Sequence, residues 1–137
     1  MSGLIYVDTS ALVKHVLEEH ESEALARATE GRSAIGSQFV TSTLTRVELG
    51  RTLRRRLEGA DVPVDSLYAA ALRGVGQAQL TDVVLELARS IEPPVLRSLD
   101  AIHLATAIAL GCHEVWTYDD RLADGAMARG MTVRAPV

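Results

Sequence analysis

Short apolar runs alternate along the chain with longer segments in which apolar residues recur every three or four positions. The short runs are typical of buried strands, and the periodic segments are typical of amphipathic helices. We expect strands over residues 4–7, 38–42, 79–81, 114–117 and 131–134. We expect helices over residues 11–17, 21–29, 44–57, 63–75, 82–91, 98–110 and 120–129. This alternation predicts an α/β fold, with a mostly parallel sheet covered by helices on both faces.

Capping and turn residues mark where several of these helices begin and end. Thr9 or Ser10 can cap the first helix. Gly31 is expected to end the second helix, and Asp82 to cap the fifth. On the helix over residues 44–57 the apolar positions recur at helical spacing, with arginines between them. These positions are Leu44, Val47, Leu53 and Leu57.

The composition is that of one globular domain spanning residues 1–137. Hydrophobic residues make up 47% of the chain but aromatic residues only 4%, so we expect a core of Leu, Val, Ala and Ile. The single cysteine, Cys112, excludes an internal disulfide and a zinc site built from cysteines. The chain does not begin with a signal-peptide pattern, and no apolar run reaches the ~18 residues that span a bilayer. We therefore expect a cytoplasmic protein with no membrane contact.

Four carboxylates stand at informative places in this pattern. Asp8 directly follows the first strand, and Asp119 follows the strand over residues 114–117. Because ligands bind outside the carboxyl ends of parallel strands, we expect both side chains at the ligand-binding edge of the sheet. Asp100 falls in the first turn of an almost wholly apolar helix, and Glu48 lies on a helix otherwise rich in arginine.

Each of these acids also has an ordinary structural explanation. Aspartate at a helix start caps the helix or meets its dipole, and Glu48 could form ion pairs at helical spacing. The residues concerned are Asp8, Asp100, Asp119 and Asp120 at helix starts, and Arg51 and Arg55 as partners of Glu48. Together, however, four carboxylates without a cysteine or histidine cluster suit a hard cation such as Mg²⁺ or Mn²⁺. The chemistry that such a site favours is metal-assisted phosphodiester hydrolysis.

Four stretches of the chain resemble a known family. The segments "IYVDTSALVK", "TRVELGR", "LDAIHLATAIALG" and "VWTYDDRLADGA" are similar, in this order, to the PIN-domain ribonucleases. More closely, they resemble the VapC-type toxins of bacterial toxin–antitoxin pairs. The resemblance implies a single PIN domain over residues 1–137, folded as a three-layer α/β/α sandwich. It also implies a Mg²⁺- or Mn²⁺-dependent endoribonuclease that forms homodimers and is blocked by a small cognate antitoxin.

The family's acidic tetrad falls on Asp8, Glu48, Asp100 and Asp119. We expect the three aspartates to bind the cation and Glu48 to position a water molecule. The small hydroxyl positions that order the site in the family fall on Ser10 and Thr117. The family pattern T-x-D selects Asp119 over its neighbour Asp120, which could cap the last helix or reach the metal through water.

Basic residues and one histidine leave alternatives open. A group of arginines could contact RNA phosphates in spite of the net charge of −4, or it could form a solvated helix face. These arginines are Arg46, Arg51, Arg54, Arg55 and Arg56. His103 shares a helix face with Asp100, a spacing compatible with metal binding, but a packed structural histidine is the more common case.

Other classes of protein remain as alternatives. A phosphotransferase of the haloacid-dehalogenase type would need a second aspartate where the chain has Ser10, and a phospho-accepting receiver domain would need a different order of acids. A catalytically inactive PIN-like module that binds RNA or a protein partner is the main alternative to the enzyme. The presence of all four acids favours the enzyme.

Overall fold

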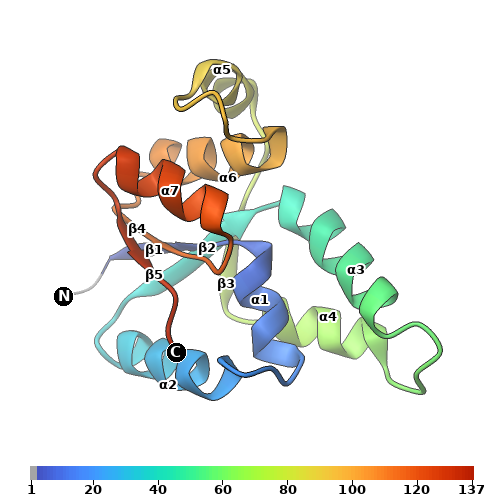
Figure 1. The fold of residues 1–137 in the computed structure, drawn as a ribbon. Helices are drawn as coiled ribbons and strands as arrows, with labels where there is room; N and C mark the ends of the chain where they lie inside the picture. The colour runs from blue at the N-terminus through green and yellow to red at the C-terminus, as the bar shows by residue number, and fades with distance from the viewer. Residues whose placement is uncertain (1–2) are drawn as a thin grey trace.

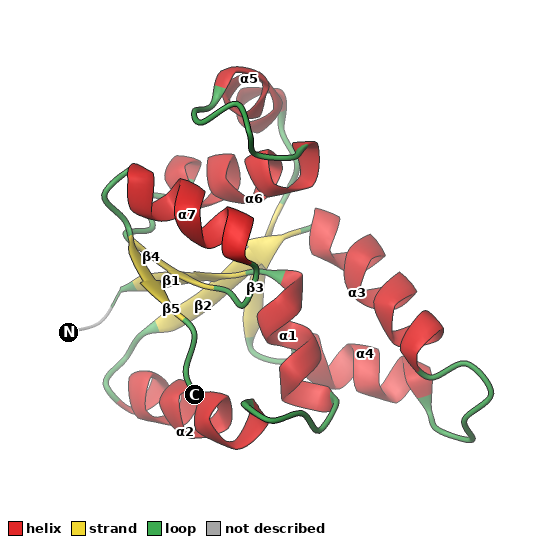
Figure 2. Cartoon of the chain, viewed as in Figure 1, coloured by secondary structure: helices red, strands yellow, loops and turns green. Residues whose placement is uncertain are grey.

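A computed structural model describes residues 3–137 and contains one five-stranded sheet (Figures 1 and 2). The strands are β1 (Leu4–Val7), β2 (Gln38–Ser42), β3 (Val75–Ala78), β4 (Glu114–Trp116) and β5 (Thr132–Arg134). They lie in the order β3-β2-β1-β4-β5, and every neighbouring pair is parallel. The predicted parallel sheet is confirmed, and β1 lies at its centre.

Helices cover both faces of this sheet, which makes the three-layer α/β/α arrangement visible in Figure 1. They are α1 (Thr9–Val16), α2 (Ser22–Ala34), α3 (Leu44–Arg56), α4 (Val64–Leu72), α5 (Asp82–Ser90), α6 (Ser98–Ala109) and α7 (Asp120–Ala128). On one side lie α1, α2 and α4, with α3 packed against α1 and α4. On the other side lie α6 and α7, and α5 packs on the outside of α6.

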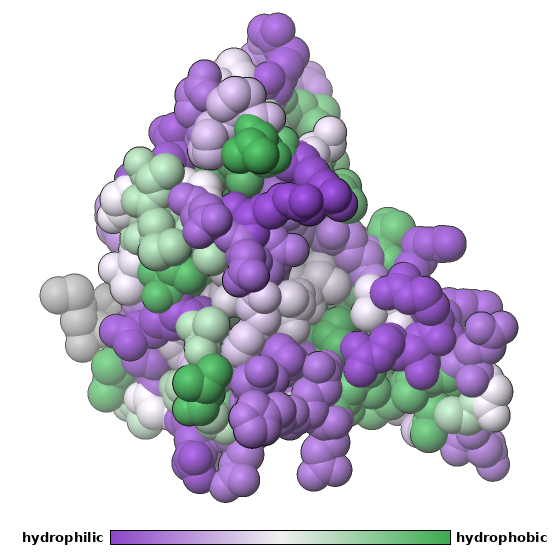
Figure 3. All heavy atoms as spheres, in the orientation of Figure 1, coloured by the Kyte–Doolittle hydropathy of each residue, from purple (hydrophilic) through white to green (hydrophobic). Residues whose placement is uncertain are grey.

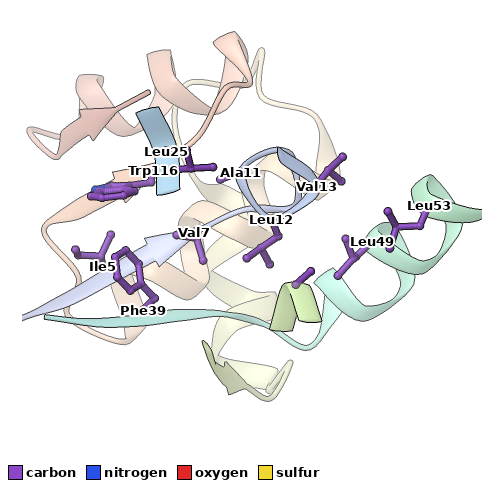
Figure 4. Packing of buried hydrophobic residues seen from close by; sticks show 11 residues of the cluster. Ile5, Val7, Ala11, Leu12, Val13, Leu25, Phe39, Leu49, Leu53 and Trp116 are labelled. Carbon is purple, nitrogen blue, oxygen red and sulfur yellow. The ribbon is translucent and has the colours of Figure 1, made fainter. Parts of the chain in front are cut away.

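The strand period of two divides the core between the two layers. Ile5 and Val7 point toward the cluster that contains Leu12 and Trp116, which Figure 4 shows between the sheet and α1. Tyr6 points the other way, into the cluster formed by α6 and α7. Polar side chains cover most of the face drawn in Figure 3. Among residues 3–137, no helix has both the length and the apolar composition that crossing a membrane requires.

The third strand differs from the prediction. It occupies residues Val75–Ala78 instead of 79–81, and the preceding helix ends at Leu72 instead of continuing to Val75. Gly74 has a φ of 74°, a conformation that ends the helix and turns the chain into the strand. The strand lies at the sheet edge and carries little apolar pattern, so its sequence does not reveal it.

The buried face of α3 also differs from the apolar pattern of its sequence. Thr45, Leu49 and Leu53 are buried at a spacing of four residues, whereas Val47 is 60% exposed. Of the four apolar positions in the predicted pattern, only Leu53 belongs to this buried face, and Leu44 and Leu57, at the two ends, are partly exposed. The remaining elements begin and end within about two residues of the predicted ranges, apart from α2 and the helix before β3.

Helix α2 runs five residues further than predicted, to Ala34. Gly31 was expected to end it but lies inside it, exposed and without a positive φ. Glycine within a helix costs only about 1 kcal/mol relative to alanine, an amount that the neighbouring turns can absorb. The helix ends before Gly36, whose φ is 90°.

Gly31 and Gly111 form a matched pair for a stability test. Neither has an atom within 4 Å of an added Cβ, but Gly111 has a φ of 74° at the end of α6. We expect Gly31→Ala to raise the free energy of unfolding by about 1 kcal/mol and Gly111→Ala to lower it by about 1 kcal/mol. Urea denaturation of the two variants measures both changes. Equal effects of the two substitutions would contradict the assigned backbone conformations.

Candidate active site

The four candidate acids come together at the carboxyl edge of the sheet. Asp8 follows β1 and Asp119 follows β4, while Glu48 comes from α3 and Asp100 from the first turn of α6. All four line one open pocket of about 420 Å³. Thr9, Ser10 and His103 line it beside these acids, and a fifth acid, Glu19, lines it together with Lys14 and Arg56.

Asp8 is the most deeply buried of the four acids, with 5% of its surface exposed. Its Oδ1 accepts a hydrogen bond from Ser10 Oγ at 2.7 Å, and its Oδ2 accepts one from Thr117 Oγ1 at 2.7 Å. Burial raises the pKa of Asp8, and the nearby His103 charge and the hydrogen bonds lower it only in part. The negative charge of Asp8 is therefore unfavourable in this buried position, and a bound cation would stabilise it.

Asp8 also caps α1, contrary to the prediction that Thr9 or Ser10 does so. Asp8 Oδ1 accepts a hydrogen bond from the backbone N of Ala11 at 3.2 Å, and the helix begins at Thr9. The capping hydrogen bond leaves Oδ1 of Asp8 able to accept further hydrogen bonds, since a carboxylate oxygen accepts more than one. The two roles that seemed to be alternatives, helix cap and site residue, are combined in one side chain.

Ser10 and Thr117 join α1 to the loop between β4 and α7. Ser10 Oγ accepts a hydrogen bond from the backbone N of Tyr118 at 2.9 Å, and Thr117 Oγ1 accepts one from the backbone N of Asp119 at 3.0 Å. Both hydroxyls also donate to Asp8, so each links the backbone of this loop to the buried carboxylate by hydrogen bonds. Their predicted places beside the acids agree with this geometry.

Asp119, and not Asp120, caps α7. Asp119 Oδ1 accepts a hydrogen bond from the backbone N of Leu122 at 2.9 Å. Asp120 is the first residue of the helix, is exposed, and does not line the pocket that contains Asp119. The structure therefore separates the two neighbouring acids that the sequence left ambiguous.

Glu48 is held by a hydrogen-bond chain that the sequence did not reveal. Its Oε1 accepts hydrogen bonds from Thr9 Oγ1 at 2.8 Å and from His103 Nε2 at 2.6 Å. His103 is 3% exposed, and its Nδ1 lies 2.5 Å from the hydroxyl of Tyr6. Burial alone would raise the pKa of Glu48, but the hydrogen bond and charge of His103 bring it below the ordinary value. Glu48 is thus kept ionised.

His103 acts within this chain as a donor to a carboxylate. Burial would lower its pKa, but the hydrogen bond and charge of Glu48 raise it. Its contacts are those of a buried, hydrogen-bonded histidine that orients a neighbouring acid. The spacing to Asp100 drew attention to His103, but its partners, Tyr6 and Glu48, lie too far away in the chain to be found by spacing.

Asp100 and Asp119 repel each other across the pocket. Burial raises the pKa of Asp100, and the negative charge of Asp119 raises it further. All the acids offer oxygen, which is the donor that Mg²⁺ and Mn²⁺ prefer. In the described part of the chain, no three His, Cys, Asp or Glu side chains converge as in a formed metal site. The donor chemistry fits a hard cation, and the carboxylates stand around one pocket without forming a finished coordination shell.

The arginines of α3 are distributed over several surfaces. Arg46 donates to Gln77 Oε1 at 2.6 Å, on the side of β3, and Arg51 and Arg55 do not line the pocket of the four acids. Arg56 does line it, together with Lys14. Of the predicted arginines, Arg56 therefore stands next to the acids, together with Lys14, which the sequence did not single out.

Comparison with known proteins gives similar results for sequence and for structure. The family model described as "PIN domain" matches residues 5–126. Ribonuclease VapC46 of Mycobacterium tuberculosis is 42% identical over 137 residues, covering 96% of this chain and 97% of that protein. The crystal structure of the same organism's VapC20, described as a sarcin–ricin loop cleaving toxin, has a TM-score of 0.74 at 19% identity and covers 96% of this chain and 99% of its own.

A second solved structure extends the similarity of fold. VapBC2 from Rickettsia felis, bound to a DNA fragment from the promoter of the pair, has a TM-score of 0.76 at 10% identity. The alignment covers 96% of this chain and 98% of that chain. At such low identity the likeness concerns the fold.

The raised pKa of Asp8 leads to a stability prediction. A carboxyl whose pKa is raised by folding stabilises the folded state fully below its ordinary pKa, and this contribution is lost as the pH rises through the raised value. Asn is neutral at every pH and caps helices as well as Asp. We expect Asp8→Asn to raise the free energy of unfolding at pH 8, without divalent cations, by on the order of 1 kcal/mol. The gain should shrink toward pH 4.

Urea denaturation at both pH values measures this difference. Asp120→Asn is the matched control, because it removes the same charge from an exposed position at the start of α7. It should change the free energy of unfolding by less than about 0.5 kcal/mol. A less stable Asp8→Asn variant at pH 8 would mean that the buried charge is fully compensated by its hydrogen bonds.

Proposed function

The chain belongs to the PIN-domain family, and from this premise we propose that it is a metal-dependent endoribonuclease, the toxin of a toxin–antitoxin pair. One observation carries the proposal. Four acids from four separate segments line a single pocket at the carboxyl edge of the sheet. The relative named a ribonuclease, which aligns over nearly the whole chain, supports the same reaction class.

We assign Asp8, Asp100 and Asp119 as the residues that would hold Mg²⁺ or Mn²⁺. Their oxygens match the preference of these ions, and the raised pKa values of Asp8 and Asp100 reflect burial that a cation would counteract. When bound, such a cation would activate water and offset negative charge on the phosphate.

The protein's own groups contribute orientation and a proton acceptor. Ser10 and Thr117 fix both oxygens of Asp8. Thr9 and His103 both donate to Oε1 of Glu48. No side chain or backbone group of residues 3–137 donates to its Oε2. We assign Glu48 Oε2 to accept a hydrogen bond from the attacking water and then its proton. Thr9, Tyr6 and His103 are positioning residues for this acid.

We also propose two protein partners, a small cognate antitoxin and a second copy of this chain. The fold likeness to VapBC2, solved with promoter DNA, supports the antitoxin. Large apolar side chains are exposed around α5 and the start of α6, which is the kind of surface that protein partners cover. They include Val83, Leu85, Val95 and Leu99.

The proposed reaction leads to a cleavage prediction. We expect Asp8→Asn, Asp100→Asn and Asp119→Asn each to lower RNA cleavage by roughly 100-fold or more, because each removes a carboxylate from the site. EDTA should stop cleavage by the parent protein, and Mg²⁺ or Mn²⁺ should restore it. Sequencing of RNA ends after incubation with cellular RNA measures cleavage and also identifies the target.

Asp120→Asn is the control for charge, and it should keep the parent rate because Asp120 lies outside the pocket. Full activity in the Asp8 and Asp100 variants would exclude the proposed site. If the parent protein binds RNA but does not cleave it with either cation, the chain is an inactive PIN-like binding module. Loss of cleavage in the Asp120 control would show that the assignment within the Asp119–Asp120 pair is wrong.

A further inference from the structure

The pocket of the four acids has a second part that is basic. Lys14 from α1 and Arg56 from α3 line it beside Thr52 and Tyr118. Glu48, Thr52 and Arg56 are spaced four residues apart, so they share one face of α3. The separation of eight positions between Glu48 and Arg56 corresponds to about 12 Å along the helix. The basic part therefore begins about two helical turns from the proposed proton acceptor.

One acidic side chain holds both cations of this basic part. Glu19, in the connection between α1 and α2, has Oε2 3.1 Å from Lys14 Nζ and Oε1 3.7 Å from Arg56. Lys14 is further fixed by Glu21, whose Oε2 lies 2.7 Å from Nζ, and by the ring of Tyr118, whose centroid lies 4.8 Å from Nζ. The amine of Lys14 is therefore held at the pocket on three sides.

The ion pairs of Lys14 are largely buried, whereas Arg56 is 46% exposed and lies farther from Glu19. The side chain of Lys14 is only 12% exposed, and those of Glu19 and Glu21 are 24% exposed. Burial alone would lower the pKa of Lys14, but Glu21 and Glu19 raise it, so the amine remains charged. The ammonium of Lys14 has three N–H groups, two of which donate to Glu19 and Glu21, and the guanidinium of Arg56 has five.

A carboxylate that bridges two cations has the same charge and oxygen chemistry as an RNA phosphodiester. We propose that Lys14 and Arg56 bind an RNA phosphate next to the one that is cleaved, and that Glu19 occupies this phosphate site in the free protein. This proposal rests on the ribonuclease function. It adds two contacts to the RNA backbone and a carboxylate of the protein, Glu19, that competes with RNA for them. RNA must displace Glu19 or share the cations with it, so Glu19 weakens binding of every sequence equally.

Three variants with two matched controls test this proposal. Glu19→Gln removes the competitor, while Lys14→Met and Arg56→Ala each remove one cation. Glu23→Gln and Arg55→Ala make the same charge changes outside the pocket, since Glu23 pairs with Arg27 and Arg55 is exposed. The probe is a fluorescein-labelled single-stranded RNA of mixed sequence. Its anisotropy is followed over a salt series in EDTA, which prevents cleavage.

Glu19→Gln should tighten RNA binding by roughly threefold or more at low salt, whereas Lys14→Met and Arg56→Ala should weaken it by roughly threefold to tenfold. Loss of either cation should also reduce the slope of log affinity against log salt by about 0.7, the value for one phosphate contact on a single strand. The gain in Glu19→Gln cannot come from misfolding, so it keeps the test valid if Lys14→Met is unstable. Both controls should stay within about twofold of the parent.

The outcomes separate this proposal from the ribonuclease function. If the parent protein binds RNA and cleaves it with Mg²⁺, but the three variants match their controls, the phosphate site is wrong and the enzyme assignment stands. If Arg55→Ala weakens binding as much as Arg56→Ala, the outer face of α3 is the contact surface instead. If the parent protein neither binds nor cleaves RNA, both proposals fail together.

Discussion

The buried carboxylate of Asp8 is the constraint on which the site and its surroundings depend. An ionised group at 5% exposure is costly unless other groups compensate for its lost hydration. The compensation comes from three donors in two segments, because Ser10 and Ala11 belong to α1 and Thr117 follows β4. One side chain at the end of the central strand thus ties a helix of one layer to a neighbouring strand. The geometry of the pocket follows from this packing, and the remaining electrostatic cost is what makes it suitable for a cation.

Glu48 is also partly buried, but its pKa is lowered where that of Asp8 is raised. Burial raises the pKa of Asp8, whereas the hydrogen-bonded His103 lowers that of Glu48, so two acids in one pocket are shifted in opposite directions. Tyr6 makes this possible because the strand period turns it away from Ile5 and toward α6, where it meets His103. No buried side-chain nitrogen or oxygen in residues 3–137 lacks a partner, as expected of a polar network that fixes one conformation.

The sequence predicts what local patterns determine and misses what distant contacts decide. Strands β1 and β2 were predicted residue for residue: β1 is continuously apolar, as buried parallel strands commonly are, and β2 contains the apolar pair Phe39 and Val40. The edge strand β3 was missed because Gly76 and its polar neighbours resemble a loop. There Gly76 packs closely on β2, since an added Cβ would lie 3.2 Å from Val40 Cγ1.

The same division holds for the site. The position of an acid after a strand is a local feature, and family resemblance identified all four acids that the fold gathers. The bonds from Thr9 and His103 to Glu48 join residues 39 and 55 positions apart, and no spacing rule connects them. A single backbone hydrogen bond, from Leu122, shows that Asp119 and not Asp120 caps α7, and no local pattern distinguishes the two acids.

Acidic and basic side chains occupy different parts of the pocket, which the net charge of −4 does not show. Screening limits interactions between exposed charges to about 10 Å, so the nearby acids and cations matter more to a bound phosphate than the total. The acids gather at the strand ends, and Lys14 and Arg56 stand beside them, joined through Glu19. In the free protein Glu19 pairs with both cations and Glu21 pairs with Lys14, so carboxylates balance both positive charges. An RNA phosphate offers these cations the same anionic oxygen as Glu19.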